Sequence, residues 1–165
     1  MAQTFLNLAQ GVTGTLPNAN FSGGKILQVQ TKILNDNVQQ TGSNVSTVIE
    51  SDTFTLSSTN NYIYLILSGN YDLQGYSATT TPMAYVFLTD TGQTVKSAHQ
   101  FRDRLSSNAL GHDSSFCLTA YYQESSTSNR RAYVRYRSDG TGQMRIIGNS
   151  SSTGATRLTI MEISA

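Results

Sequence analysis

The chain has 165 residues, and its 11 Lys and Arg against 10 Asp and Glu give a formal net charge of +1. This length predicts about one domain with a hydrophobic core of its own. The near-neutral balance argues against a general nucleic-acid binder, which carries a basic patch or stripe. It also argues against a basic amphipathic helix on a membrane surface. The longest apolar run, Tyr62 to Leu67, is too short to insert across a bilayer.

The N-terminal segment, residues 1–24, is polar and aperiodic. Its middle, Gly11 to Asn20, contains glycines, a proline and turn-forming Asn and Thr residues that break any regular period. We expect an extended arm here that docks on a partner protein, followed by one β-domain over residues 25–165. The segment lacks the basic start and apolar run of a secretory signal, so we expect assembly in a host cytoplasm. The residues expected to make the docking contacts are Phe5, Leu6, Leu8, Val12, Leu16, Pro17 and Phe21.

The rest of the chain is typical of strands and turns. Ser, Thr, Asn, Gln, Gly and Tyr dominate, and no stretch has a convincing helical pattern. Regularly spaced short strands without helices predict a single antiparallel β-sandwich of the jelly-roll kind. The expected strands are Lys25 to Leu34, Thr47 to Leu56, Tyr62 to Ser68, Met83 to Thr89, Thr94 to Phe101, Ser115 to Gln123, Arg131 to Arg137, Gln143 to Ile147 and Thr156 to Ile163.

Two glycine-containing connections look like hairpin turns. Asp90-Thr91-Gly92-Gln93 and Ser138 to Gly142 each lie between expected strands, and glycine supplies the positive φ that tight turns need. The segment from His112 to Ser115 reads as a loop. The strand from Tyr62 is apolar on both faces, which predicts a central position in its sheet.

The strand from Arg131 has two different faces. Alternation places Ala132, Val134 and Tyr136 toward the core and a basic row on the opposite side. One interpretation of this row is a solvated face, in which the aliphatic parts of the Arg side chains cover apolar surface. The alternative is a patch that binds a partner carboxylate, a glycan or a neighbouring subunit. The expected members of the row are Arg131, Tyr133, Arg135 and Arg137, with Arg145 extending it across the following hairpin.

The last strand is apolar on both sides. Leu158 and Ile160 point one way while Met161 and Ile163 point the other, so the strand is either central in its sheet or buried between subunits. Glu162 lies in its middle, and a buried carboxylate is costly unless it is paired, so we expect an Arg partner from this chain or from a symmetry mate. The expected subunit interface is Leu158, Ile160, Met161, Glu162 and Ile163.

The sequence offers little for catalysis or metal binding. His112-Asp113-Ser114-Ser115 contains the residue types of a catalytic triad, but neighbours in sequence cannot adopt triad geometry with one another. Cys117 is the only cysteine and is interpreted as a small buried or half-buried hydrophobe. His99 and His112 give no zinc spacing, and no segment matches a calcium loop. We expect no catalytic residues, no metal and no cofactor.

Both ends of the chain resemble a known group of proteins. The segment Gly11-Val12-Thr13-Gly14-Thr15-Leu16-Pro17-Asn18-Ala19-Asn20, followed by Gly23-Gly24-Lys25-Ile26-Leu27-Gln28-Val29, resembles small virion structural proteins of tailed bacteriophages. The ending Leu158-Thr159-Ile160-Met161-Glu162-Ile163 is similar to the endings of the same group. The middle of the chain matches only in composition. The resemblance implies a homotrimeric jelly roll of the tumour-necrosis-factor type, and it transfers no catalytic residues.

These observations predict a non-enzymatic virion protein. Because the chain has neither coiled-coil heptads nor shaft repeats, the favoured role is a capsid decoration or cement protein. The expected partners are further copies of the chain and a major capsid protein or tail component, with neither nucleic acid nor membrane. One alternative is a tail-fibre or receptor-binding tip that recognises a host-surface glycan. A second is a free carbohydrate-binding module.

Overall fold

The computed structural model describes residues 24–41, 44–74, 83–102, 111–138, 143–146, 148 and 155–165. These residues form strands and no helix, so none of them belongs to a helix that could cross a bilayer. The predicted arm lies outside them, apart from Gly24. The strands are β1 (Ile26–Ile33), β2 (Val38–Thr41), β3 (Ser46–Glu50), β4 (Tyr62–Gln74), β5 (Met83–Thr89), β6 (Val95–Arg102), β7 (Gly111–Gln123), β8 (Tyr133–Ser138), β9 (Gln143–Ile146) and β10 (Arg157–Ile163).

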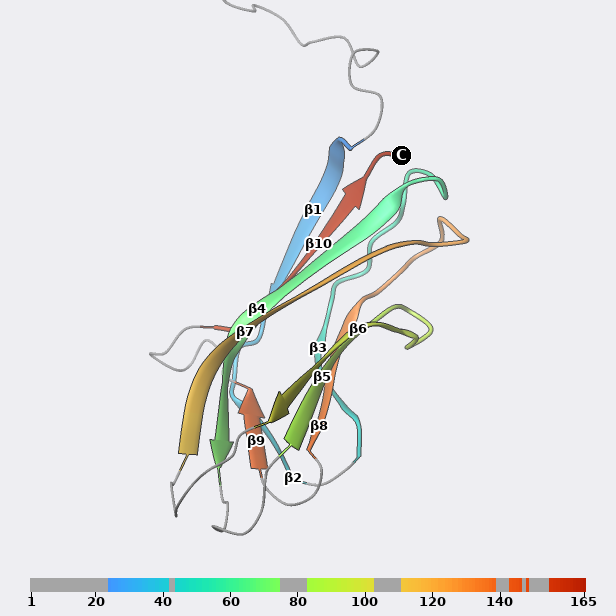
Figure 1. Cartoon of the computed structure of the whole chain (residues 1–165). Helices are drawn as coiled ribbons and strands as arrows, with labels where there is room; N and C mark the ends of the chain where they lie inside the picture. The colour runs from blue at the N-terminus through green and yellow to red at the C-terminus, as the bar shows by residue number, and fades with distance from the viewer. Residues whose placement is uncertain are drawn as a thin grey trace, which may run out of the picture.

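The strands form two antiparallel sheets that pack face to face, which confirms the predicted β-sandwich (Figure 1). The first, called sheet A, has the order β1-β10-β4-β9-β2, and β7 pairs with β4. The second, called sheet B, has the order β3-β8-β5-β6. Figure 1 shows β4 running along the sandwich, with β1 and β10 beside its first half and β9 beside its end.

Strand β4 is the centre of sheet A, as its apolar pattern predicts. It pairs with β7 along its whole length, with β10 over Tyr62–Ser68 and with β9 over Tyr71–Gln74. The predicted end at Ser68 is wrong, because the strand continues through Gly69 and Asn70 to Gln74. These polar residues resemble a turn in sequence, but the ladder with β7 keeps them extended.

The core lies between the two sheets and is built by alternate residues of the central strands. The predicted inward set of β8, with Ala132 just before it, is confirmed: Ala132, Val134 and Tyr136 are buried. Fully burying a side chain as large as that of Val134 contributes roughly 1.5–3 kcal/mol. Other buried apolar residues of the central strands include Ile63, Leu65, Leu67 and Tyr71 of β4, Ala84, Val86 and Leu88 of β5, and Leu158 and Ile160 of β10.

Three local expectations are wrong because long-range pairing decides them. Residues Ser138 to Gly142 do not close a hairpin, since β8 belongs to sheet B and β9 to sheet A. The segment from His112 is not a loop but part of β7, paired with β4. The expected strand from Thr47 ends at Glu50, and beyond it Phe54 forms only an isolated bridge with Arg130. Strand β2 was not predicted, because Val38–Thr41 is short and largely polar.

The predicted hairpin between β5 and β6 is present, but its turn differs in detail. The backbone N–H of Gln93 donates to the carbonyl of Asp90 at 2.9 Å, which closes the turn. The positive φ falls on Gln93, at 61°, rather than on Gly92. Asp90 Oδ1 accepts from the backbone N–H of Thr94 at 2.9 Å, so a side chain helps to hold this turn.

A close approach explains the glycine in the middle of β4. A Cβ atom on Gly69 would lie 2.2 Å from Thr156 Oγ1 and 2.8 Å from Thr156 Cβ. Thr156 is fully buried just before β10, so it has little room to move. We expect Gly69→Ala to lower the free energy of unfolding by about 1–3 kcal/mol through overpacking, measured by urea denaturation.

The matched control is Gly92→Ala. A Cβ atom there would lie 3.4 Å from Asp90 Oδ1, which is ordinary contact. This control should change stability by less than about 1 kcal/mol. Equal destabilisation by both substitutions would contradict the steric explanation for Gly69.

Candidate functional site

Much of the side of sheet A that faces away from the core is apolar, and exposed Arg157 at the start of β10 is a charged residue at its edge. Each of its strands alternates core residues with outward residues, and the register aligns the outward ones into rows. One row crosses four strands as Val29, Met161, Tyr64 and Tyr121. We call this surface the apolar outer face and define it by Val29, Thr31, Tyr62, Tyr64, Ile66, Tyr121, Thr159, Met161 and Ile163.

Three tyrosines form the centre of this face. The rings of Tyr62 and Tyr121 stack with centroids 4.5 Å apart and an interplanar angle of 12°. Tyr64 meets Tyr121 edge to face at 6.3 Å. Tyr121 is 57% exposed, so the cluster presents ring surface to solvent. Such pairs stabilise the sheet by about 0.5–1.5 kcal/mol beyond their burial, and ring surface of Tyr121 remains exposed among the described residues.

Strand β1 extends the apolar outer face because its polar side chains point inward and its apolar side chains point outward. An ordinary edge strand has the opposite arrangement. Gln28, Gln30 and Lys32 point toward the segment that follows β3, where Lys32 pairs with Asp52 at 2.8 Å. Val29 therefore points outward and is 54% exposed. Polar residues inward and apolar residues outward are the opposite of what solvent alone favours.

The chain enters β1 beside the C-terminus. The backbone N–H of Gly24 donates to the carbonyl of Ser164 at 2.9 Å, and the N–H of Ser164 donates to the carbonyl of Lys25 at 2.8 Å. Residues 1–23 therefore join the sandwich at the end of the apolar outer face that Ile163 and Tyr62 occupy. The predicted docking residues, Phe5 to Phe21, lie outside the described residues.

The structure divides the predicted interface residues of the last strand between two faces. Leu158, Ile160 and Glu162 face the core and are 0%, 4% and 2% exposed, so none of them can contact a second subunit. Met161 and Ile163 are half-buried and belong to the apolar outer face. The strand itself lies between β1 and β4, so it is central in its sheet.

Glu162 pairs with no Arg among the described residues, and at 2% exposed it cannot meet one from a second copy, so that expectation is wrong. Its Oε1 accepts from the backbone N–H and hydroxyl of Ser57, both at 2.8 Å, and from Asn61 Nδ2 at 2.7 Å. Its Oε2 accepts from Gln28 Nε2 at 2.7 Å. Burial alone would raise the pKa of this carboxyl, but the hydrogen bonds from Asn61, Ser57 and Gln28 outweigh it and hold the pKa below its ordinary value of 4.5. Neutral donors therefore replace the expected cation.

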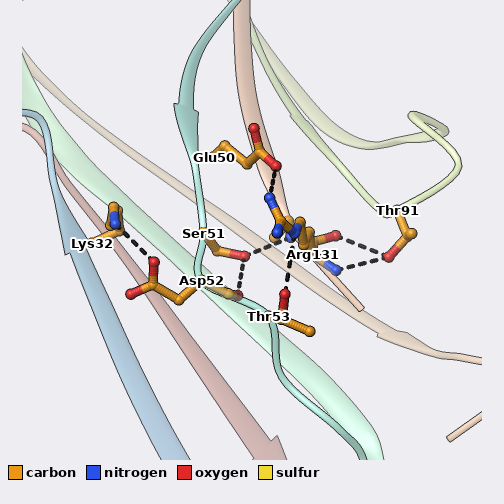
Figure 2. A network of polar contacts seen from close by, with 8 residues as sticks. Lys32, Glu50, Ser51, Asp52, Thr53, Thr91 and Arg131 are labelled. Atoms are coloured by element: carbon orange, nitrogen blue, oxygen red, sulfur yellow. Dashed lines mark hydrogen bonds and ion pairs between the residues drawn. The ribbon is translucent and has the colours of Figure 1, made fainter. Parts of the chain in front are cut away.

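The first member of the predicted basic row has a structural role. Arg131 forms an ion pair with Glu50, and its Nε donates to Thr53 Oγ1 at 3.2 Å (Figure 2). Its backbone N–H donates to Thr91 Oγ1 at 2.9 Å. Figure 2 shows these contacts joining the segment after β3 to the start of β8 and to the turn after β5. The guanidinium of Arg131 is therefore committed within the chain.

The other members of the row separate into two groups. Tyr133, Arg135 and Arg137 are half-buried on the outer side of sheet B, as alternation predicts. Arg145 does not extend the row, because β9 belongs to sheet A. There Arg145 pairs with Asp72 at 2.5 Å, which neutralises a carboxylate that is almost fully buried.

The side chains that commonly bind metal ions do not cluster in the described part of the chain. Its His, Cys, Asp and Glu residues form no group of three or more that could hold a metal ion. Cys117 is exposed on β7, so the expectation of a buried or half-buried side chain is wrong.

Comparisons with known proteins found weak structural likenesses. No protein-family model matches this chain, and no curated protein sequence is significantly similar to it. The EclA C-terminal domain, described as a sugar-binding protein, has a TM-score of 0.37 and 12% identity over 95% of this chain and 99% of that chain. The VP2 subviral particle of infectious bursal disease virus has a TM-score of 0.27 and 11% identity over 84% of this chain and 38% of that chain.

A chain of the Israeli acute paralysis virus particle has a TM-score of 0.27 and 11% identity over 99% of this chain and 78% of that chain. None of these three structures is from a tailed phage. At TM-scores below 0.5, the likenesses carry no functional argument.

The Glu162 network predicts a pH-dependent contribution to stability. Because the pKa of Glu162 is lowered in the folded state, its contribution is complete above about pH 4.5 and is lost as the pH falls through the folded value. We expect Glu162→Gln to cost about 1–3 kcal/mol at pH 7, since an amide NH₂ would face groups that donate. Urea denaturation at pH 7 and pH 3 should show a smaller acid loss in the variant than in the wild type.

The control for this prediction is Glu50→Gln, which breaks the exposed ion pair with Arg131. That pair should be worth no more than about 1 kcal/mol. A Glu162→Gln variant as stable as the wild type at pH 7, or with the full acid loss, would disprove the role given to the network.

Proposed function

We propose that this protein is a non-enzymatic structural component of a virion, which forms a homotrimer through the apolar outer face and attaches to another virion protein through its N-terminal arm. The observation that carries this proposal is the apolar outer face itself. Contiguous apolar patches that remain on an isolated domain mark interaction sites. Its tyrosines and Met161 are residue types enriched at interface cores.

The composition of the face favours a second copy of the same chain as its occupant. None of its nine defining residues is charged. The cores of protein interfaces are depleted in charge, and those of homo-oligomers are more apolar than others. Around a threefold axis, three copies of a face without charges can lie together without repulsion between like charges. Closed cyclic symmetry then gives an assembly of fixed size rather than an open fibre.

The arm supplies the second part of the proposal. It reaches the sandwich at Gly24, beside Ser164, and so at the edge of the surface assigned to the other copies. Its sequence is too short and too polar to bury a core of its own, yet it contains several large apolar residues. Such a segment gains affinity by lying along a partner, at the cost of ordering the chain. The partner of a decoration or cement protein is the capsid surface.

Oligomeric state tests the apolar outer face. We expect the wild type to be a trimer by light scattering coupled to size-exclusion chromatography, and Met161→Glu to be a monomer. A carboxylate at the centre of the interface should weaken association at least about 100-fold. Because Met161 is only half-buried, the isolated domain should still fold.

The matched control is Ala98→Glu, which adds the same charge at an exposed position of β6 in sheet B. It should leave the trimer intact. A monomeric wild type at tens of micromolar, or a Met161→Glu variant that remains trimeric, would disprove the assembly.

Deletion of residues 1–22 tests the arm separately. We expect the truncated protein to keep its thermal transition and its oligomeric state, because the described core does not include these residues. It should fail to load onto particles that lack the protein, measured by co-sedimentation. Deletion of residues 1–4 keeps every predicted docking residue from Phe5 onward and should load normally. Loading of the longer deletion would contradict a docking arm.

A further inference from the structure

We propose that the outer side of sheet B binds a single sugar ring that carries a carboxylate. This inference is independent of the proposed assembly, because it concerns the opposite side of the sandwich. It rests on a hollow beside unsatisfied polar atoms, an aromatic ring that lines it, and two arginines that pair with no carboxylate among the described residues.

The hollow lies over β5 and β8 and has a volume of about 180 Å³. It is lined by Val45, Phe87, Thr89, Val95 and Arg135. Pockets for drug-sized ligands span about 300–1,000 Å³, so this one suits one small ring. Val45 and Val95 are exposed apolar residues at its rim.

Two of the residues that line this hollow have a buried polar atom without a hydrogen bond. Thr89 is 1% exposed, yet its hydroxyl has no partner, and Nε of Arg135 has none either. Buried polar groups in folded proteins are almost always hydrogen-bonded, so each exception needs an explanation. A small rotation of each side chain would bring its buried atom to the surface of the hollow. A ligand hydroxyl seated there would accept from Arg135 Nε–H and exchange a hydrogen bond with Thr89.

An aromatic platform continues from the hollow along β5. The rings of Tyr85 and Phe87 are nearly parallel, with centroids 6.2 Å apart and an interplanar angle of 9°. Gln100 Nε2 donates to the Tyr85 hydroxyl at 3.1 Å. The Arg137 guanidinium covers one face of Tyr85, so Phe87, which lines the hollow, offers the ring surface. The apolar C–H face of a sugar ring can pack there while its hydroxyl edges meet the unsatisfied hydrogen-bonding groups.

The two arginines select an acidic ligand. The Arg137 guanidinium lies 4.6 Å from the centroid of Tyr85, and Arg135 pairs in register with Phe87. No carboxylate among the described residues pairs with either of them. Arg131, further along the same row, already pairs with Glu50. Guanidinium groups bind carboxylates through paired N–H donors, so the ligand that completes this site carries a carboxylate.

The experiment is an NMR titration of the full chain with galacturonate, and with galactose as the neutral sugar. We expect saturable shifts with galacturonate centred on Thr89 and Arg135, and at least tenfold weaker binding of galactose. No galacturonate binding at millimolar concentrations would overturn the site. Equal affinity for galactose would overturn the assignment of a carboxylate.

Two variants test the residues. Thr89→Val removes the unsatisfied hydroxyl at nearly constant shape, so it should weaken binding about threefold to tenfold while the melting temperature stays the same or rises. Arg135→Gln should weaken binding at least about tenfold. The control Arg157→Gln removes the same charge from an exposed position in sheet A and should bind as the wild type does. Unchanged binding in both test variants would overturn the proposal.

The same titration separates this inference from the proposed assembly. The Met161→Glu variant should keep galacturonate binding, since Met161 lies on the other side of the sandwich. Loss of binding in that variant would show that the site depends on the assembly, and would overturn its assignment to sheet B alone.

Discussion

The register of β4 is the constraint on which the rest of this structure depends. This strand pairs with β7 along one edge and with β10 and then β9 along the other. A slip of one residue would move Ile63, Leu65 and Leu67 to solvent and bring Tyr62, Tyr64 and Ile66 into the core. Because its neighbours are in register with it, β4 determines which residues of sheet A face inward and which form the apolar outer face.

A buried carboxylate then fixes the end of the sandwich near the C-terminus. Glu162 accepts hydrogen bonds from β1, through Gln28, and from Ser57 and Asn61 just before β4. A buried ion pair gains little once desolvation is counted, whereas four donors satisfy the charge and position three segments together. Because side chains alternate along β1, the inward position of Gln28 places Val29 on the outer side. One strand register therefore produces both the polar network around Glu162 and the apolar surface outside.

The two outer sides of the sandwich therefore differ in chemistry. The outer side of sheet A presents tyrosines and aliphatic residues, with Arg157 as an exposed charge at its edge, which suits contact with another protein. Sheet B presents Arg135, Arg137 and aromatic rings around an unsatisfied hydroxyl, which suits a small polar ligand. Because the inner sides of the two sheets pack against each other, an assembly through the outer side of sheet A leaves the outer side of sheet B accessible. Structural assembly and ligand binding can thus coexist in one domain.

The sequence by itself determined the all-β class, the central position of β4 and the two faces of β8 and β10, because side-chain alternation is a local property with a period of two. It did not determine that β8 and β9 lie in different sheets, that Arg145 pairs with Asp72, or that Glu162 binds neutral donors. It placed Arg135 and Arg137 on one face but not beside Phe87 and Thr89. Those contacts join residues far apart in the chain, so only the packing of the sheets decided them.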